Sequence, residues 1–524
     1  MLIFLSRRLI ASLLLLLVAS FLVYISFTYA GNPLGFLNEI SDPAQREQVR
    51  KSVTDRLNLE TPRVERYFLW LGDVIPFNVK SSFPFVTWDG VDFGISARTQ
   101  LSVNDELTSR LPLTLKLVFG AFILSLTFGV TTGIVTALRQ YSGFDYIVTF
   151  FTFLFFSVPV FWVAVILKDW GGISFNDWWR DGAHLPSWLI VTGGLFAAVI
   201  GYSIAGGRWP RRAAIALATG AAGLGLLVYV SEAGWLVNPG IGLPILIPLA
   251  LGIAVAATAV FAGIGNKRAL GSALTTAAIG IVSYLPLQDY FDGPKFAWKH
   301  AVLLLAITLV VGALVGLLWG GFDKGLSAKV SALVAFLVGL VIFIDRHMQS
   351  WNDYAADPIV RNRPIKTIGH QEPRLADKGF WIVNNDAFAH MILPTMALML
   401  ISLAGYTRYT RASMLEVLNL DYIRTARAKG LTERTVIVRH GLRNALIPLA
   451  TIIAFDIGAM LGGAVITESV FEWAGMGRMF IDGLNNLDPN VVMASTMVVG
   501  ATAVVANIIA DILYSVLDPR IRLN

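Results

Sequence analysis

Few side chains in this sequence have the types and spacing that catalysis or metal binding requires. The chain has no cysteine, which excludes thiol nucleophiles, disulfides and thiolate metal ligands. A Gly-Lys dipeptide is also absent, so the chain lacks the G-x-x-x-x-G-K-[ST] loop that holds nucleotide phosphates. The six histidines are scattered without metal-ligand spacing: they are His184, His300, His347, His370, His390 and His440. We therefore predict no catalytic residue, no metal site and no cofactor bound by this chain itself.

The most ordered polar stretch is "DYIRTARAKGLTERTVIVRHGLRNALIP". Asp421 is predicted to cap a short helix, because its carboxylate can accept hydrogen bonds from free backbone N–H groups. Gly430 supplies the left-handed residue that ends such a helix. Thr432 is expected to cap a second short helix, with Glu433 favourable in its first turn. That second helix is predicted to run to Pro448, where the next apolar run begins.

This stretch has two interpretations. Positive charge alone is typical of any loop that stays on the inner side of a membrane. A capped helix of fixed length, joined stiffly to an apolar run at each end, is more rigid than topology requires. A push on a rigid helix moves the helices attached to it, whereas mobile chain absorbs the push. The order of the stretch favours a helix that docks onto a partner.

The composition predicts an all-α polytopic membrane protein, since 55% of the 524 residues are hydrophobic and only 15% are charged. Soluble domains are about a quarter charged. Runs of about 20 apolar residues predict twelve membrane helices. Six lie at 9–30, 114–138, 146–167, 387–406, 446–466 and 491–513, and six more at 186–205, 213–231, 241–264, 269–287, 301–320 and 328–345. The first run could instead be a cleaved signal peptide, but its length favours an uncleaved span.

The positions of Lys and Arg predict the orientation, because these residues resist translocation. Arg7 and Arg8 place the N-terminus inside, and the loop 408–443 is also inside, with eight Lys or Arg against three Asp or Glu. The C-terminal "DPRIRLN" then lies inside as well. Two long segments lie outside: 31–113, which we expect to be a small folded cap, and 346–385, which we expect to be an extended connector.

Two features lie within predicted spans. Asp456 stands in the middle of its span, where an acid costs a few kcal/mol and should face protein or water. It could line a transport pathway or form a hydrogen bond between helices, and the sequence leaves both interpretations open. Gly129-x-x-x-Gly133 allows close helix approach, and we interpret it as a packing feature.

Several stretches together resemble the B-type permease subunit of the oligopeptide/dipeptide/nickel family of binding-protein-dependent ABC importers. The most specific is "YTRYTRASMLEVLNLDYIRTARAKGLTERTVIVRHGLRNALIP". Others are "MLIFLSRRLIASLL", "SRLPLTLKL", "SVPVFWVA", "HMILPTMAL", "LGGAVITESVFEWAGMGRM" and "IIADILYSVLDPRIR". All of them fall within 1–167 and 386–524. In place of the Glu-Ala-Ala of the broader importer signature, this chain has Arg424-Thr425-Ala426, a departure that looks usual for the peptide subfamily.

The resemblance implies a six-span type I ABC importer permease core in the bacterial cytoplasmic membrane. Such a subunit is not an enzyme: it pairs with a second permease subunit, two ABC ATPase subunits or domains that bind ATP and Mg, and an extracellular solute-binding protein. Membrane lipid surrounds it, and no nucleic-acid partner is expected. In that family the inner loop docks into a cleft of the ATPase. The resemblance therefore implies an ATPase-coupling role for Asp421, Tyr422, Ile423, Arg424, Thr425, Ala426, Arg427, Ala428, Lys429, Gly430 and Leu431.

The resemblance also predicts how the chain is divided. The parts are a first span at 1–30, an extracellular segment at 31–113, core spans at 114–167 and core spans at 386–524 that carry the coupling loop 408–443. Between the two sets of core spans, 168–385 is an inserted block of about six membrane helices and a connector. We expect the block to be an accessory helical layer that packs lipid or anchors the complex, with a regulatory or transport role as the alternative.

The expected substrate is a dipeptide or oligopeptide, with nickel, glutathione or an oligosaccharide as alternatives within the same family. A secondary transporter is the main alternative from another class, and a membrane scaffold is a third. Secondary transporters commonly show two similar halves, whereas the inserted and flanking blocks of this chain do not resemble each other. A scaffold would leave the ordered loop unexplained.

Overall fold

The computed structural model describes residues 2–75, 77–79, 86–88, 90–321 and 324–517. The predicted inner tail, 518–524, lies outside the described residues. The chain divides into two compact units. The first contains Met1–Gly172, Thr367–His370 and Met391–Asn524, and the second contains Ile173–Lys366 and Gln371–His390.

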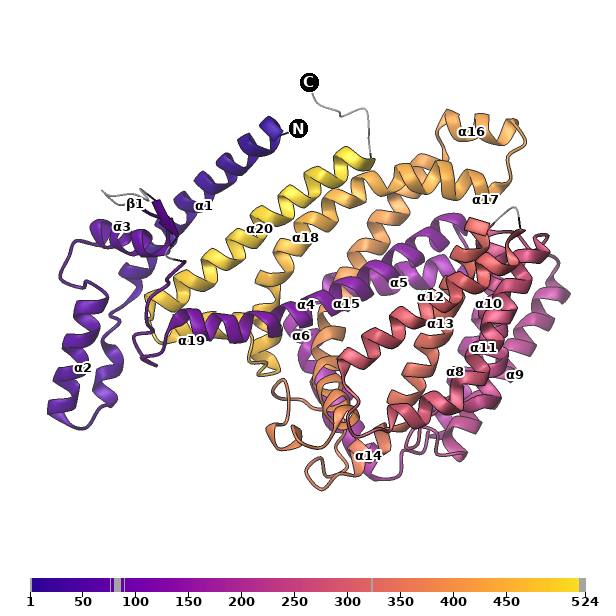
Figure 1. The fold of residues 1–524 in the computed structure, drawn as a ribbon, viewed down its shortest axis with the longest axis horizontal. Helices are drawn as coiled ribbons and strands as arrows, with labels where there is room; N and C mark the ends of the chain where they lie inside the picture. Colours follow the sequence, from indigo (N-terminus) through magenta and orange to yellow (C-terminus); the bar gives the residue numbers. More distant parts are fainter. Residues whose placement is uncertain (1, 76, 80–85, 89, 322–323, 518–524) are drawn as a thin grey trace. The chain divides into compact units, whose positions relative to one another are not determined.

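The first unit is built from long helices (Figure 1). They are α1 (Leu2–Ala30), α4 (Val103–Leu138), α5 (Gly143–Ser157), α6 (Val160–Ile166), the part of α15 (Phe380–Leu418) that follows His390, α18 (Arg443–Val470), α19 (Met476–Asn485) and α20 (Pro489–Leu517). Helix α20 packs along both α18 and α1, and α4 contacts α5, α18, α19 and α20. Their apolar side chains form the core of this unit.

Helix α4 crosses α15 closely because two glycines face that helix. A Cβ atom at Gly129 would lie 2.7 Å from the Tyr406 Cβ, and one at Gly133 would lie 2.6 Å from the Thr410 Cβ. The hydroxyls of Thr132 and Thr407 meet at 2.8 Å beside this crossing. The packing interpretation of the two glycines is confirmed.

The predicted continuous span 146–167 is wrong, because the chain bends there by 106°. Helix α5 ends at Ser157 and α6 begins at Val160. Pro159 has no N–H for the helical ladder, and its ring forces the preceding residue into extended backbone. Val158 indeed has φ −91° and ψ 127°. The proline therefore turns one expected helix into two.

The segment 31–113 is folded. It contains α2 (Pro43–Arg56), α3 (Arg63–Val74) and the antiparallel pair β1 (Phe77–Val79) and β2 (Val86–Trp88), followed by a loop into α4. Tyr67 and Trp70 of α3 are buried against Tyr24 of α1. The Ser20 and Tyr67 hydroxyls lie 2.8 Å apart. Aromatic packing and this hydrogen bond attach the segment to α1.

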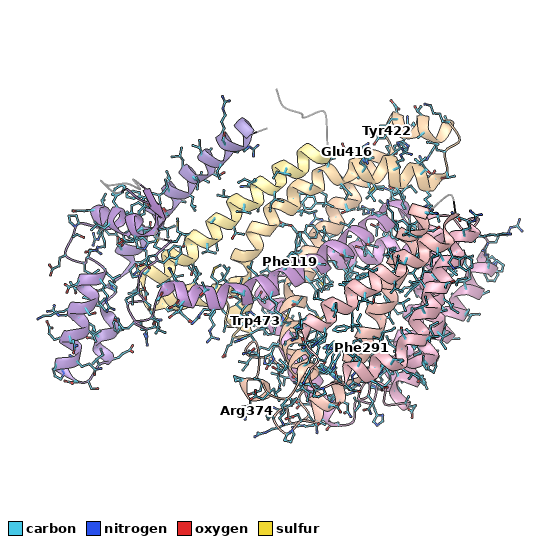
Figure 2. All side chains as sticks on the ribbon, viewed as in Figure 1. Phe119, Phe291, Arg374, Glu416, Tyr422 and Trp473 are labelled. Atoms are coloured by element: carbon cyan, nitrogen blue, oxygen red, sulfur yellow. The ribbon has the colours of Figure 1, made fainter. Side chains whose placement is uncertain are left out.

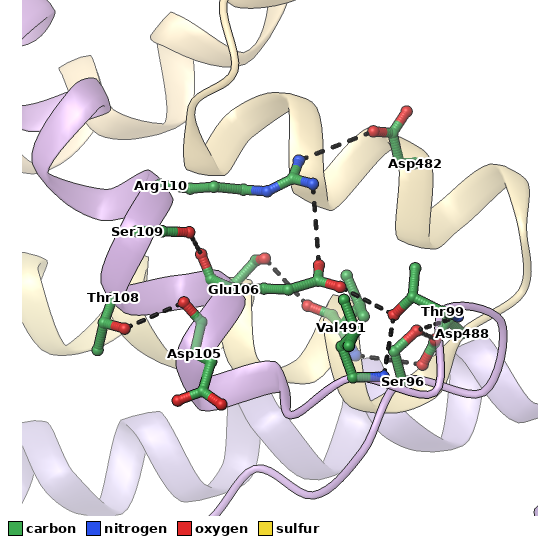
Figure 3. A network of polar contacts seen from close by, with 12 residues as sticks. Ser96, Thr99, Asp105, Glu106, Thr108, Ser109, Arg110, Asp482, Asp488 and Val491 are labelled. Carbon is green, nitrogen blue, oxygen red and sulfur yellow. Dashed lines mark hydrogen bonds and ion pairs between the residues drawn. The ribbon is translucent and has the colours of Figure 1, made fainter.

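The loop before α4 is attached to the turn between α19 and α20 (Figure 3). Asp488 is buried, and its carboxylate accepts hydrogen bonds from the Ser96 hydroxyl and the Ala97 N–H, both at 2.7 Å. Burial raises the pKa of Asp488, although these hydrogen bonds oppose the rise. Near this site Arg110 lies 3.9 Å from Glu106 and 4.0 Å from Asp482. The segment is thus held at both of its ends.

The second unit is a bundle of six long helices. They are α8 (Ser187–Ile204), α9 (Trp209–Glu232), α10 (Gly242–Phe261), α11 (Lys267–Phe291), α12 (Trp298–Trp319) and α13 (Lys324–Gln349). Helix α8 packs on α9, α10 on α11 and α12 on α13, and α13 also packs on α10 and α11. Buried Asp345 accepts hydrogen bonds from the Tyr284 hydroxyl and the Ile241 N–H, both at 2.6 Å. This carboxylate joins α13 to α10 and α11.

The expectation of an extended connector at 346–385 is wrong. The connector contains α14 (Trp351–Ala356) and the single turn Pro373–Leu375. Tyr354 is fully buried, and its hydroxyl lies 3.2 Å from the Pro364 carbonyl. Trp351 and Tyr354 supply apolar surface for local packing. The prediction missed this packing because it rested on the prolines and charged residues of the segment.

The prediction of an all-α polytopic membrane fold is confirmed. Among the described residues, ten helices are long and apolar enough to cross a membrane, and the bent α5–α6 stretch adds one more. Helix α18, 28 residues long, covers the remaining predicted span. The two three-residue strands are the only regular exception within the described part of the chain.

Candidate functional site: the helical loop between α15 and α18

The ordered polar stretch folds as a compact helical loop. It consists of α16 (Asp421–Ala428), α17 (Glu433–Thr435) and π-helical turns at Val436–Leu442 that lead into α18. Figure 1 shows α16 beside α17, at the end of α18 that is opposite to α19. All of these residues belong to the first unit.

The prediction that Asp421 caps α16 is wrong. Leu420, with extended backbone at φ −73° and ψ 150°, takes the capping position, and no side chain caps the helix. Asp421 is instead the first helical residue, with its side chain 94% exposed and 3.4 Å from Arg424. A carboxylate in the first turn still interacts favourably with the helix dipole, so the local preference for an acid was recognised but its position was not.

The end of α16 and the start of α17 follow the prediction. Gly430 has φ +75°, the left-handed conformation that ends a helix at little cost for glycine. The Thr432 side chain accepts a hydrogen bond from the Thr435 N–H, and Glu433 stands in the first turn of α17. The glycine and the threonine cap depend only on residues next to them in the sequence, and the structure places both as predicted.

The inner face of α16 is held against the helix that follows it. Ile423 and Ala426 pack on Val436, and all three are buried. Tyr422 lies on α16 (Figure 2). The Asn444 side-chain amide donates to the Tyr422 hydroxyl at 2.7 Å, which joins α16 to the start of α18. An isolated helix of eight residues is unstable in water, so these contacts are what keep α16 formed.

The outer face of α16 is exposed but carries less free charge than its sequence suggests. The Arg427 guanidinium forms two hydrogen bonds with Glu433, at 2.7 and 3.2 Å. This pairing raises the pKa of Arg427 and lowers that of Glu433. Arg424 is paired with Asp421, and among the described residues Lys429 forms no ion pair.

Two leucines flank α16 on the exposed side. Leu420 is 45% exposed and Leu431 is 41% exposed. Leu431 belongs to the predicted coupling set, whereas sequence reasoning missed Leu420 because it precedes the expected cap. These two leucines add apolar area beside the charged side chains of α16. The outer surface of α16 therefore offers shape and apolar area together with its cations.

The predicted boundary at Pro448 is also wrong, since Pro448 lies inside α18. The chain is helical without interruption from Glu433 to Val470. Helices in membranes tolerate proline where the neighbouring backbone adjusts, and the π-helical turns directly before α18 are such an adjustment. Helix α18 alone is about 42 Å long at about 1.5 Å per residue.

The base of the loop is joined to α4 and α5. Met414 and Val417 of α15 pack on Ala137 of α4 and Ala445 of α18. Nearby, the Arg411 guanidinium binds Asp145 through two hydrogen bonds of 2.9 Å, and Asp145 is buried at the start of α5. Sequence reasoning missed this ion pair because 266 residues separate its members. A force that displaces α16 would thus act on α4, α5, α15 and α18 together.

Asp456, the candidate pathway residue, lies on α18 and is partly exposed. It is close enough to the buried Tyr406 of α15 for the two polar groups to interact. Asp456 thus lies away from the α16 surface, and the structure brings it together with none of the predicted coupling residues. Its role in a pathway stays a prediction.

Comparison with known proteins identifies the family. Residues 329–523 match the family described as the binding-protein-dependent transport system inner membrane component, and residues 1–118 match its N-terminal membrane component. The chain belongs to this family. The loop and α16 lie within the first match, so the permease resemblance is confirmed on its most specific stretch, whereas "SVPVFWVA" at 157–164 lies outside both matches. Residues 119–328 lie outside both matches.

Relatives with curated names are peptide permeases. The oligopeptide transport system permease protein OppB of Mycobacterium bovis is 44% identical over 156 residues, which are 30% of this chain and 48% of the relative. The oligopeptide permease protein AppB of Bacillus subtilis is 51% identical over 137 residues, 26% of this chain and 43% of the relative. The dipeptide permease protein DppB of Escherichia coli K12 has the same identity over 137 residues, 26% of this chain and 40% of the relative. The permease therefore matches less than half the length of each relative.

Proposed function

We propose that this permease is one half of the membrane pathway of an ATP-driven importer for dipeptides or oligopeptides. Three features support the proposal: membership of the binding-protein-dependent transport family, relatives named as peptide permeases, and a rigid helical loop between α15 and α18. Nickel, glutathione and oligosaccharides remain alternative substrates within this proposal.

The observation that carries the proposal is the construction of α16. Its inner face is fixed to the π-helical turns by Ile423 and to α18 by the Tyr422–Asn444 hydrogen bond, while its outer face is exposed. In the proposed mechanism, ATP closes a pair of partner ATPases and moves α16 as a rigid body. The movement passes into α15 and α18, which rock between outward-open and inward-open states.

Three kinds of partner follow from the proposal. A second permease subunit completes the pathway, two ABC ATPases bind ATP and Mg, and a solute-binding protein delivers the substrate. The proposed location is the bacterial cytoplasmic membrane, with both termini and α16 inside. The division of the chain, including an accessory role for the block 168–385, belongs to the same proposal.

Site-directed labelling tests the docking of α16 directly, because the chain has no native cysteine. Thr425 is exposed on α16, so Thr425→Cys should react with a maleimide reagent in the purified permease. Assembly with the ATPases should slow that reaction at least tenfold. Lys51→Cys, on an exposed position of α2, is the matched control and should react equally in both states. Equal labelling of both positions after assembly would refute the docking role.

A further inference from the structure

A small cavity lies between the segment 31–113 and the ends of α1 and α20 within the first unit. Its volume is about 220 Å³. Pockets for drug-sized ligands are larger, at about 300–1,000 Å³. Its walls include side chains of both charges and several aromatic rings: Tyr24, Arg56, Arg66, Trp70, Asp73 and Asp92. A ligand of amino-acid or dipeptide size matches this volume.

The acidic side of the cavity holds two carboxylates without a cation. Asp73 and Asp92 form no ion pair among the described residues, and Asp92 accepts one hydrogen bond, from the Gly94 N–H at 2.8 Å. Burial raises the pKa of Asp73, and the negative charge of Asp92 raises it further. A ligand ammonium group would relieve both effects.

The basic side of the cavity is held in place by neutral partners. Arg56 donates to the Gln100 side chain at 2.8 Å. Arg66 donates to the backbone carbonyls of Asn58, Leu59 and Thr61 at 2.7–3.1 Å. These contacts fix the two guanidinium groups and leave their charge uncompensated, which suits them for a carboxylate.

An independent observation comes from the aromatic wall, where one buried polar group lacks a partner among the described residues. Trp70 is 8% exposed, and its indole N–H is buried with no acceptor in the described part of the chain. Tyr24 is 3% exposed, lies near Arg66 and stacks on Trp70 with ring centroids 6.0 Å apart. A buried polar group without a partner is costly, so the Trp70 N–H points to a polar occupant.

We propose that this cavity binds a small zwitterion, with its ammonium group at Asp73 and Asp92, its carboxylate at Arg56 and Arg66, and its side chain on Trp70. Two carboxylates and two guanidinium groups line the cavity and form no ion pair with one another in the described part of the chain, which favours a zwitterion over a simple cation or anion. The choice of a short peptide among zwitterions rests on the proposed function. The site is distinct from the loop around α16.

The test measures binding to the full permease alone, in lipid nanodiscs without ATPase or binding protein. The probes are radiolabelled Ala-Phe, its N-acetyl derivative, its C-terminal amide and free phenylalanine. Binding of Ala-Phe should weaken at least tenfold on N-acetylation, on amidation, in Asp73→Asn and in Arg56→Gln. Asp55→Asn, on an exposed carboxylate that does not line the cavity, should bind as the unaltered chain does.

The pairing of variant and probe decides the question. N-acetylation of the probe should not weaken its binding to Asp73→Asn any further, and amidation of the probe should not weaken its binding to Arg56→Gln any further. In each case the variant and the modified probe remove the same contact. No binding, or binding that is insensitive to both capped probes, would overturn the proposal. Peptide uptake by cells without cavity binding would overturn it and leave the proposed function standing. Cavity binding of zwitterions without peptide uptake would support the cavity and count against the proposed function.

Discussion

Truncation of Ile423 tests whether α16 transmits force, since it loosens the helix without altering its outer surface. Ile423 is fully buried against Ala426 and Val436. Ile423→Ala removes three carbons, worth about 2.4 kcal/mol at about 0.8 kcal/mol each, and the remaining cavity adds to this loss. The Tyr422–Asn444 hydrogen bond contributes about 1 kcal/mol, so Ile423 is the larger anchor.

A loss of about 2.4 kcal/mol makes detachment of α16 about 50-fold more frequent, and the remaining cavity raises this factor. Hydrogen exchange of the α16 amides in the full permease should therefore accelerate by about this factor. Peptide uptake should fall, while ATP hydrolysis by the assembled complex continues. Val438→Ala is the matched control, because Val438 is 55% exposed on the π-helical turns and its truncation should change neither quantity. Accelerated exchange with uptake unchanged would refute the rigid-lever mechanism.

Three further predictions concern the rest of the first unit. Arg411→Ala should destabilise the permease by about 3–5 kcal/mol, because it leaves the Asp145 carboxylate buried without its cation; thermal unfolding in nanodiscs measures the loss, and a change below about 1 kcal/mol would contradict it. Gly133→Ala should destabilise by about 1–3 kcal/mol through a clash with α15, whereas Gly405→Ala, where nothing lies within 4 Å, should be neutral; equal melting temperatures for the two variants would exclude a close crossing. The melting temperature of the unaltered chain, measured relative to that of Asp488→Asn, should fall as the pH rises from about 4. The raised pKa of Asp488 means that the fold favours the protonated acid, and this contribution to stability is lost at higher pH. A melting-temperature difference that does not depend on pH would contradict the prediction.

Local signals in the sequence predicted local structure well. Gly430 and Thr432 act where the sequence placed them, because a left-handed residue and a cap depend on only a few neighbouring atoms. Asp421 failed as a cap because the extended backbone at Leu420 begins the helix one residue earlier. The apolar runs predicted the membrane helices, since their length and composition decide the preference for lipid.

Features that depend on distant residues could not be predicted. The Arg411–Asp145 ion pair requires α15 and α5 to meet, and neither residue carries a local sign of its partner. The two prolines show the same limit: Pro159 breaks a helix, whereas Pro448 lies within one. Their local chemistry is identical, so the packing around each must decide the outcome. The membership of the candidate coupling set was read from the resemblance, and only labelling or uptake can test it.

The bend at Pro159 limits what can surround this part of the permease. Residue 159 has no N–H, so the Phe155 carbonyl loses the donor that an unbroken helix would supply. Hydrocarbon chains offer no replacement, and irregular backbone at that depth persists only against protein or water. The bend falls near the middle of the predicted third span, so fatty-acid tails alone cannot solvate it there. Protein, from this chain or from a partner, or water must therefore contact the bend in the assembled transporter.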